Sequence, residues 1–236
     1  MLRDADGEFQ ILENQVPVET QMEYLIYSGH LRELVPDDAE LAFQEFASVL
    51  FDPAGSLDKK KKILSVLAIS KEIGAYRMLQ KYVQEPDKEL NDWAHMALME
   101  SRVMLESEFT NERQIYISTG LGGKGNRLRF FVVLLSADGK PFLDYQRQTI
   151  EREFEFAMRN FDGEIEEITI HKKYVELMIL IPIQANIKQF IENVVSECNQ
   201  YGNFIANTIT ITNVKKLTEK EIAQIIKKHE NIRTGF

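Results

Sequence analysis

Residues 127–136, RLRFFVVLLS, contain six consecutive apolar side chains, Phe130 to Leu135. A short unbroken apolar run rich in aromatic and β-branched residues predicts a strand buried in a sheet. The turn that follows, residues 137–141, contains Asp, Gly and Pro, which end regular structure. The elements on either side of this strand therefore determine how the sheet is covered.

The pattern beyond this strand alternates between helix and strand. Apolar residues at helical spacing predict a helix over 144–161, and Asn186 is placed to cap a second helix. Strands are predicted over 164–171, 174–183 and 205–214. The order β-α-β-β-α-β over 127–214 is similar to the ferredoxin-like plan, which implies two helices on one face of a four-stranded antiparallel sheet. The predicted fold class is therefore α+β.

The N-terminal half has a helical period. Helices are predicted from Thr20, from Pro36-Asp37-Asp38, over 57–70 and 71–84, and over 89–107, where Ala94, Ala97 and Leu98 lie close together. Residues 57–107 resemble HEAT-type repeats, because small alanines allow stacked helices to approach while leucines fill the gaps. A generic small helical bundle fits the same pattern, and both interpretations stay open.

Charge and period together predict the domain boundaries. Residues 1–108 hold 21 acids and 11 bases, a net charge of −10, whereas residues 109–236 hold 16 acids and 17 bases, a net charge of +1. We expect an N-terminal arm over 1–18, an acidic helical domain over 19–108, a connection over 109–126 and the ferredoxin-like domain over 127–214. Residues 215–236 form either a docked helix or a mobile arm, with a capping box at Thr218-Glu219-Lys220-Glu221.

Cysteine content and hydropathy indicate the compartment. Cys198 is the one cysteine, so an intramolecular disulfide is excluded, and a thiol-poor chain fits a reducing compartment. The first twenty residues carry five acids and no long apolar segment, which is unlike a secretory signal. The apolar runs are shorter than the roughly 20 residues of a membrane helix. We therefore expect a cytoplasmic protein that does not enter a membrane.

The glycine-rich segment before the buried strand is the candidate ligand- or partner-binding site. Glycines can expose backbone N–H groups to a phosphate, and neighbouring lysine and arginine add positive charge. The segment departs from the P-loop pattern, because Lys124 is followed by Gly125 and then by a strand. A hairpin or linker is the simpler interpretation. The candidate residues are Gly120, Gly122, Gly123, Lys124, Gly125, Arg127 and Arg129.

Other reactive side chains form no recognisable constellation. The four histidines lack metal-ligand spacing, so neither a metal site nor another cofactor is predicted. Cys198 falls on the apolar stripe of its helix, which predicts a core thiol rather than a nucleophile. Glu166 and Glu167 point to opposite faces of a strand. A transposase would need a His-x-His pair and a nearby tyrosine, and His171 is isolated. No catalytic residues are assigned and no enzyme is predicted.

These observations leave three hypotheses for function. The first is a non-catalytic protein-interaction or regulatory protein, with a protein partner or a homodimer and with nucleic acid not favoured. The second is a sensor of a small anion, nucleotide or amino acid that uses the Gly-rich loop. The third is binding of RNA or single-stranded DNA through basic side chains of the C-terminal half. These are Arg127, Arg129, Lys172, Lys173, Lys215, Lys216, Lys227 and Lys228.

Overall fold

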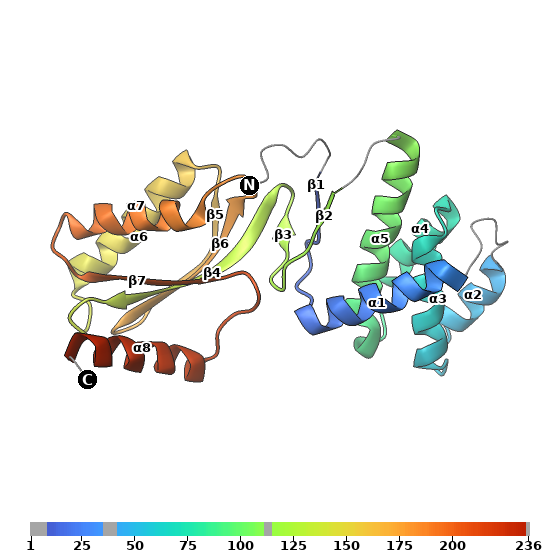
Figure 1. Ribbon diagram of the computed structural model, residues 1–236, viewed down its shortest axis with the longest axis horizontal. Helices are drawn as coiled ribbons and strands as arrows, with labels where there is room; N and C mark the ends of the chain where they lie inside the picture. The colour runs from blue at the N-terminus through green and yellow to red at the C-terminus, as the bar shows by residue number, and fades with distance from the viewer. Residues whose placement is uncertain (1–8, 35–41, 111–114, 235–236) are drawn as a thin grey trace. The chain divides into compact units, whose positions relative to one another are not determined.

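The computed structural model describes residues 9–34, 42–110 and 115–234 (Figure 1). The chain divides into two compact units between Gly120 and Leu121. We call the first the helical unit and the second the α+β unit. Helices followed by a mixed helix-and-sheet part confirm the predicted α+β class at this level. No helix among the described ranges is long and apolar enough to cross a bilayer.

The helical unit consists mainly of short helices around a shared core. Its elements are β1 (Phe9–Ile11), α1 (Val18–Leu34), α2 (Phe43–Leu50), α3 (Leu57–Ile69), α4 (Ile73–Tyr82), the 3-10 helix η1 (Lys88–Leu90), α5 (Asn91–Thr110) and β2 (Ile115–Ile117). The predicted helix start at Pro36-Asp37-Asp38 lies outside the described residues. β1 and β2 form a parallel pair, with Phe9 opposite Ile115.

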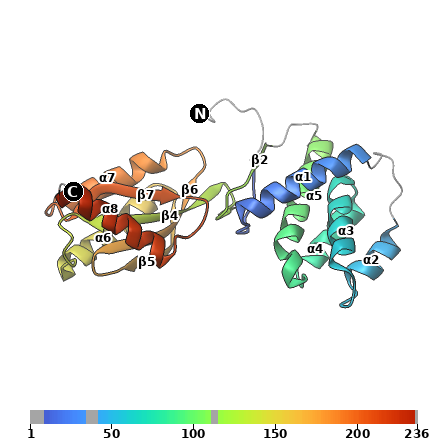
Figure 2. The same ribbon diagram turned by 60° about the horizontal axis from the view of Figure 1, so that its bottom comes forward.

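The structure does not support the resemblance to HEAT repeats. In a repeat array each pair of helices contacts its neighbours along one direction, which gives a row of interfaces. Here α1 lies across both α3 and α5 (Figure 2), and residues from Leu12 to Met99 enter one hydrophobic cluster, in which the rings of Tyr24 and Trp93 lie 5.0 Å apart. The alternative of a small bundle describes this packing better.

The α+β unit contains a curled antiparallel sheet. Its elements are β3 (Gly123–Lys124), β4 (Arg127–Ser136), α6 (Asp144–Asn160), β5 (Glu164–Ile170), β6 (Tyr174–Pro182), α7 (Ile187–Asn199), β7 (Ile205–Thr212) and α8 (Glu219–Thr234). The strands lie in the order β5-β6-β4, and both β7 and β3 pair with the other edge of β4. β3 was not predicted from the sequence, because a two-residue strand has no period.

Both faces of the sheet are covered, which explains the unbroken apolar run in β4. Val132 and Leu134 enter the cluster formed with α6 and α7. Phe131, Val133 and Leu135 point to the opposite face and enter a second cluster with Ile222 of α8. Figure 1 shows α6 and α7 on one side of the sheet and α8 on the other. Residues 219–234 are therefore a docked helix and not a mobile arm.

Two predicted helix caps are confirmed, and one detail differs. Asn186 Oδ1 accepts a hydrogen bond from the backbone N of Gln189 at 3.1 Å. At the start of α8 the Thr218 backbone N donates to Glu221 Oε2 at 2.8 Å, and the Glu221 backbone N donates to Thr218 Oγ1 at 3.4 Å, which completes the predicted capping box. α6 ends at Asn160, one residue before the predicted end at 161, and Asp162 beyond it is left-handed, with φ of 52°.

Cys198 is expected to react slowly with thiol-specific reagents in the folded protein. The thiol is buried on α7, as predicted, and burial raises its pKa to about 12. Since the thiolate is the nucleophile, little reactive species is present at neutral pH. Reaction with a chromogenic disulfide reagent should be slow in buffer and fast in urea. Equal rates in the two solutions would contradict the buried position.

Candidate nucleic-acid interface

The Gly-rich segment forms a tight hairpin rather than an open phosphate loop. Gly123 pairs with Leu128, and Gly125 occupies the turn with φ of 59°. Gly120, Gly122 and Gly123 are buried, whereas Lys124 and Gly125 are exposed. The carbonyl of Gly122 accepts a hydrogen bond from the backbone N of Arg129 at 3.0 Å. The backbone of this segment is therefore used mainly to pair the hairpin.

Carboxylates on β5 pair with the charged side chains of the hairpin. Lys124 Nζ lies 3.1 Å from Glu164 Oε2, and Arg127 Nη1 lies 3.9 Å from the same oxygen. Arg129 makes a bidentate contact with Glu166, at 2.5 and 2.8 Å. The structure thus brings the three predicted basic residues together, and an anionic ligand would have to compete with these pairs.

A second basic surface lies on the outer side of α8. Its crest is formed by Lys220, Gln224, Lys227 and Asn231, which recur at helical spacing and are all exposed. Lys228 is exposed beside this crest. Within the part of the chain that the structure describes, Lys220, Lys227 and Lys228 form no ion pair. We call these five residues the α8 basic face.

The acidic side chains of α8 lie on its flanks, away from the α8 basic face. Glu221 pairs with Lys215 at 2.6 Å, and this hydrogen bond, with those from Thr218, lowers the pKa of Glu221 to about 2. Glu230 pairs with Lys173 at 3.5 Å. The helix N-terminus, where Glu219 lies, favours negative charge. The outward crest therefore presents positive charge and amide groups without an intervening carboxylate.

The turn between β5 and β6 extends this surface. Lys172 and Lys173 are exposed, and the Lys173–Glu230 pair connects the turn to the C-terminal part of α8. His171 and Tyr174 on either side of the two lysines stack with ring centroids 4.2 Å apart and 12° between their planes. Two basic side chains are therefore flanked by two aromatic ones at this end of the sheet.

The remaining histidines form no metal site in the structure. His30 is exposed, and His95 Nδ1 lies 2.9 Å from the backbone oxygen of Asn91. His229 turns its Nε2 inward on α8, where that atom has no hydrogen-bond partner among the described residues. Across residues 9–34, 42–110 and 115–234, no three histidine, cysteine or carboxylate side chains are grouped as metal ligands.

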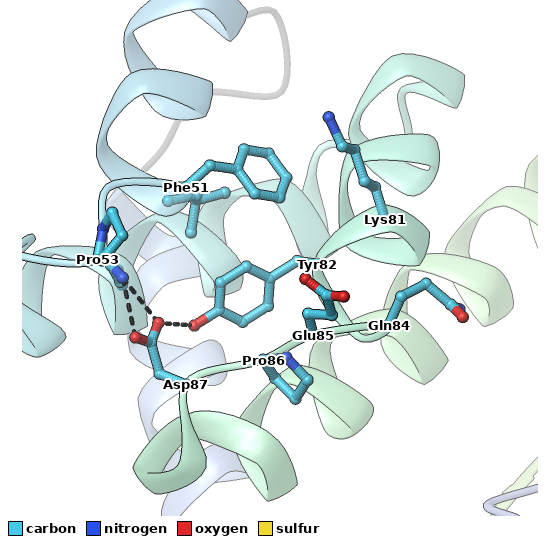
Figure 3. A pocket seen from close by; sticks show the side chains of 10 residues that line it. Phe51, Pro53, Lys81, Tyr82, Gln84, Glu85, Pro86 and Asp87 are labelled. Atoms are coloured by element: carbon cyan, nitrogen blue, oxygen red, sulfur yellow. Dashed lines mark hydrogen bonds and ion pairs between the residues drawn. The ribbon is translucent and has the colours of Figure 1, made fainter.

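Sequence analysis missed a buried charged group in the helical unit. A cavity of about 450 Å³ lies beside α4, lined by Phe51, Tyr82 and Asp87 among others (Figure 3). Lys60 lies in the helix predicted over 57–70, but its side chain is 2% exposed and donates to both oxygens of Asp87, at 3.0 and 2.8 Å. The sequence did contain a sign of this burial. Lys60 lies four residues before Leu64, so both side chains fall on the same buried face of α3.

The chain is similar to known proteins in structure and not in sequence. No family model and no curated protein matches the chain. Among solved structures, a Deinococcus radiodurans protein described as a transposase matches with a TM-score of 0.37 and 14% identity, over 46% of this chain and 93% of its own. A REP-associated tyrosine transposase bound to a REP hairpin matches with a TM-score of 0.33 and 12% identity, over 48% and 71%.

These matches contradict the first functional hypothesis. Both proteins are described as transposases, which are enzymes, and one of them was solved with a hairpin bound. The predictions of a non-catalytic protein-interaction or regulatory function, of a favoured protein partner and of no enzyme were therefore wrong. These predictions were based on the absence of recognisable catalytic motifs from the sequence. At TM-scores this low the likeness carries no mechanism, so the function must be argued from the residues of this chain.

Proposed function

We propose that the α+β unit binds nucleic acid through the α8 basic face. The observation that carries the proposal is the crest of α8, where lysines without an ion pair among the described residues recur beside Gln224 and Asn231. Lysine neutralises phosphates, and amide side chains donate to phosphate and sugar oxygens. Such contacts do not distinguish one nucleotide sequence from another. A single strand or a hairpin is the class of ligand proposed, and hairpins are included because a matched transposase was solved with one.

We further propose that the sheet follows the ferredoxin-like plan. The strand order β5-β6-β4-β7 supports it, as do α6 and α7 on one face. In this proposal β3 is an addition to the four-stranded plan, and α8 covers the face that the two helices leave open. Because α8 covers this face, the positive charge that contacts the nucleic acid lies on α8 and not on the sheet.

The Gly-rich hairpin remains a proposed secondary contact. Lys124, Arg127 and Arg129 lie on the strand pair that leads into β4, and each is paired with Glu164 or Glu166. A basic side chain that binds a phosphate there must first give up its carboxylate partner. The net gain in binding free energy is therefore smaller than on the α8 basic face. Gly120, Gly122, Gly123 and Gly125 contribute the hairpin geometry in this proposal.

Removing charge from the α8 basic face is expected to weaken binding about 100-fold at 0.1 M salt. The variant is Lys220→Gln, Lys227→Gln and Lys228→Gln. Each phosphate contact with a single strand changes the logarithmic salt slope by about 0.7, so one contact is worth about fivefold at 0.1 M relative to 1 M salt. Fluorescence anisotropy with a labelled single strand of about 20 nucleotides, longer than most single-strand sites, measures the change.

A matched control removes three positive charges from the opposite face of the sheet. Arg152, Arg159 and Lys188 lie exposed on α6 and α7. Replacing each by glutamine changes the net charge by the same amount, so it separates local contact from overall charge. The proposal expects this control to bind like the wild type. An α8 variant that binds as tightly as the control would overturn it.

A further inference from the structure

The stacked pair at the β5–β6 turn has an exposed aromatic surface. His171 packs one ring face against Tyr174, and its side chain is 37% exposed. His171 Nε2 lies 2.9 Å from Glu176 Oε1, and its backbone N donates to the Tyr174 carbonyl at 2.9 Å. Despite this short distance, His171 Nε2 has no hydrogen-bond partner among the described residues, so the orientation of the imidazole is set by its stack on Tyr174.

The backbone of the turn is held from a different direction as well. The backbone N of Phe142 donates to the Lys172 carbonyl at 2.7 Å, and that of Ser136 donates to the Lys173 carbonyl at 2.8 Å. Arg147 Nη1 donates to the Ile170 carbonyl at 2.9 Å. A turn tied to the preceding strand and helix loses little conformational entropy on binding, which favours recognition by stacking.

Two lysines adjoin this aromatic surface. Lys172 and Lys173 follow His171 in the chain, and both are exposed. Lys173 is paired with Glu230 of α8. Nucleobases stack on aromatic rings whatever their sequence, while lysines follow the phosphates on either side. In a duplex the bases already stack on each other and their faces are inaccessible. A base therefore reaches His171 only where it is unpaired.

We infer that the His171–Tyr174 pair is a stacking platform for an unpaired nucleobase. The ligand of the α8 basic face is then a single strand, or the unpaired part of a hairpin, whose backbone follows α8 to the β5–β6 turn. This inference rests on the proposed function, because the lysines of α8 supply the adjoining phosphate contacts. His171 positions the strand by stacking, and no covalent step is involved.

The test uses the full chain with a single strand of about 16 nucleotides that carries 2-aminopurine, since sites of this kind span up to about that length. The variants are His171→Leu, which removes the stacking surface, and His171→Phe, which restores it. Wild type and His171→Phe should quench the 2-aminopurine fluorescence, whereas His171→Leu should lose the quenching and bind roughly tenfold more weakly. A blunt duplex of equal length should bind more weakly than the single strand.

The outcomes separate this inference from the proposed function. If His171→Leu quenches and binds like the wild type while the α8 variant loses binding, the platform is overturned and the nucleic-acid function stands. If neither variant changes binding, both are overturned. A His171→Phe variant that fails as His171→Leu does, with an unchanged circular dichroism spectrum, would show that the imidazole acts by hydrogen bonding and would also overturn the stacking role.

Discussion

Replacing Asp87 by alanine is expected to destabilise the helical unit by about 3–5 kcal/mol, because it leaves a buried lysine without its counter-ion. Lys60 is almost fully buried and donates to both carboxylate oxygens of Asp87, and Tyr82 OH donates to Oδ2 at 2.5 Å. Trp93, the one tryptophan of the chain, lies in this unit, so its fluorescence during urea unfolding reports the loss.

Two further variants show whether charge or packing causes the effect. Tyr82→Phe removes one donor and should cost about 1 kcal/mol. Lys60→Met with Asp87→Ala removes both charges, so it should recover most of the stability lost in Asp87→Ala. A loss below about 1 kcal/mol in Asp87→Ala would mean that water solvates Lys60, against its buried position.

The same pair gives the helical unit an acid-sensitive contribution. Burial alone would raise the pKa of Asp87, but hydrogen bonds from Lys60 and Tyr82 outweigh it and hold the pKa below the ordinary value of 3.8. The folded pKa is therefore lower than the unfolded one. The stabilisation is complete above pH 3.8 and is lost as pH falls through the lowered pKa.

Replacing Phe154 by alanine is expected to destabilise the α+β unit by about 3–5 kcal/mol, because it leaves a cavity in a closely packed core. Phe154 is 0% exposed and belongs to the cluster of α6, α7 and the sheet. Phe156 is a matched control on the same helix, since it is 65% exposed. Phe156→Ala should change the free energy of unfolding by less than about 0.5 kcal/mol.

Circular dichroism and tryptophan fluorescence together assign this loss to one unit. Phe154→Ala should move the far-ultraviolet transition to lower urea and leave the Trp93 transition unchanged, because Trp93 belongs to the helical unit. A Trp93 transition that moves by the same amount would contradict independent units. Equal effects of Phe154→Ala and Phe156→Ala would contradict the assigned helix face.

Local periodicity was sufficient to predict most elements of the α+β unit. The apolar run of β4, the cap at Asn186 and the stripe carrying Cys198 each depend on neighbours in sequence. The β1–β2 pair does not, because it joins Phe9 to Ile115 across the whole helical unit. The docking of α8 likewise depends on the open face of a sheet that forms far from it in the chain.

The candidate site was predictable in its residue types but not in its pairing. Lys172 and Lys173 were recognised as basic, yet their position near α8 follows from the contact between Lys173 and Glu230. The pairing of Arg129 with Glu166 depends on a register shift in β5 between Ile165 and Glu167, which period-two alternation does not reveal. The functional error had a different origin, since missing motifs are not evidence for a protein partner.

The salt dependence of binding tests nucleic-acid recognition by α8 most directly. Affinity for the labelled single strand is measured from low to moderate salt for the wild type, the α8 variant and the control with changes at Arg152, Arg159 and Lys188. The wild type and the control should share one slope, and the α8 variant should be flatter by about 2, which is three contacts at about 0.7 each. Three equal slopes would contradict phosphate contacts by Lys220, Lys227 and Lys228.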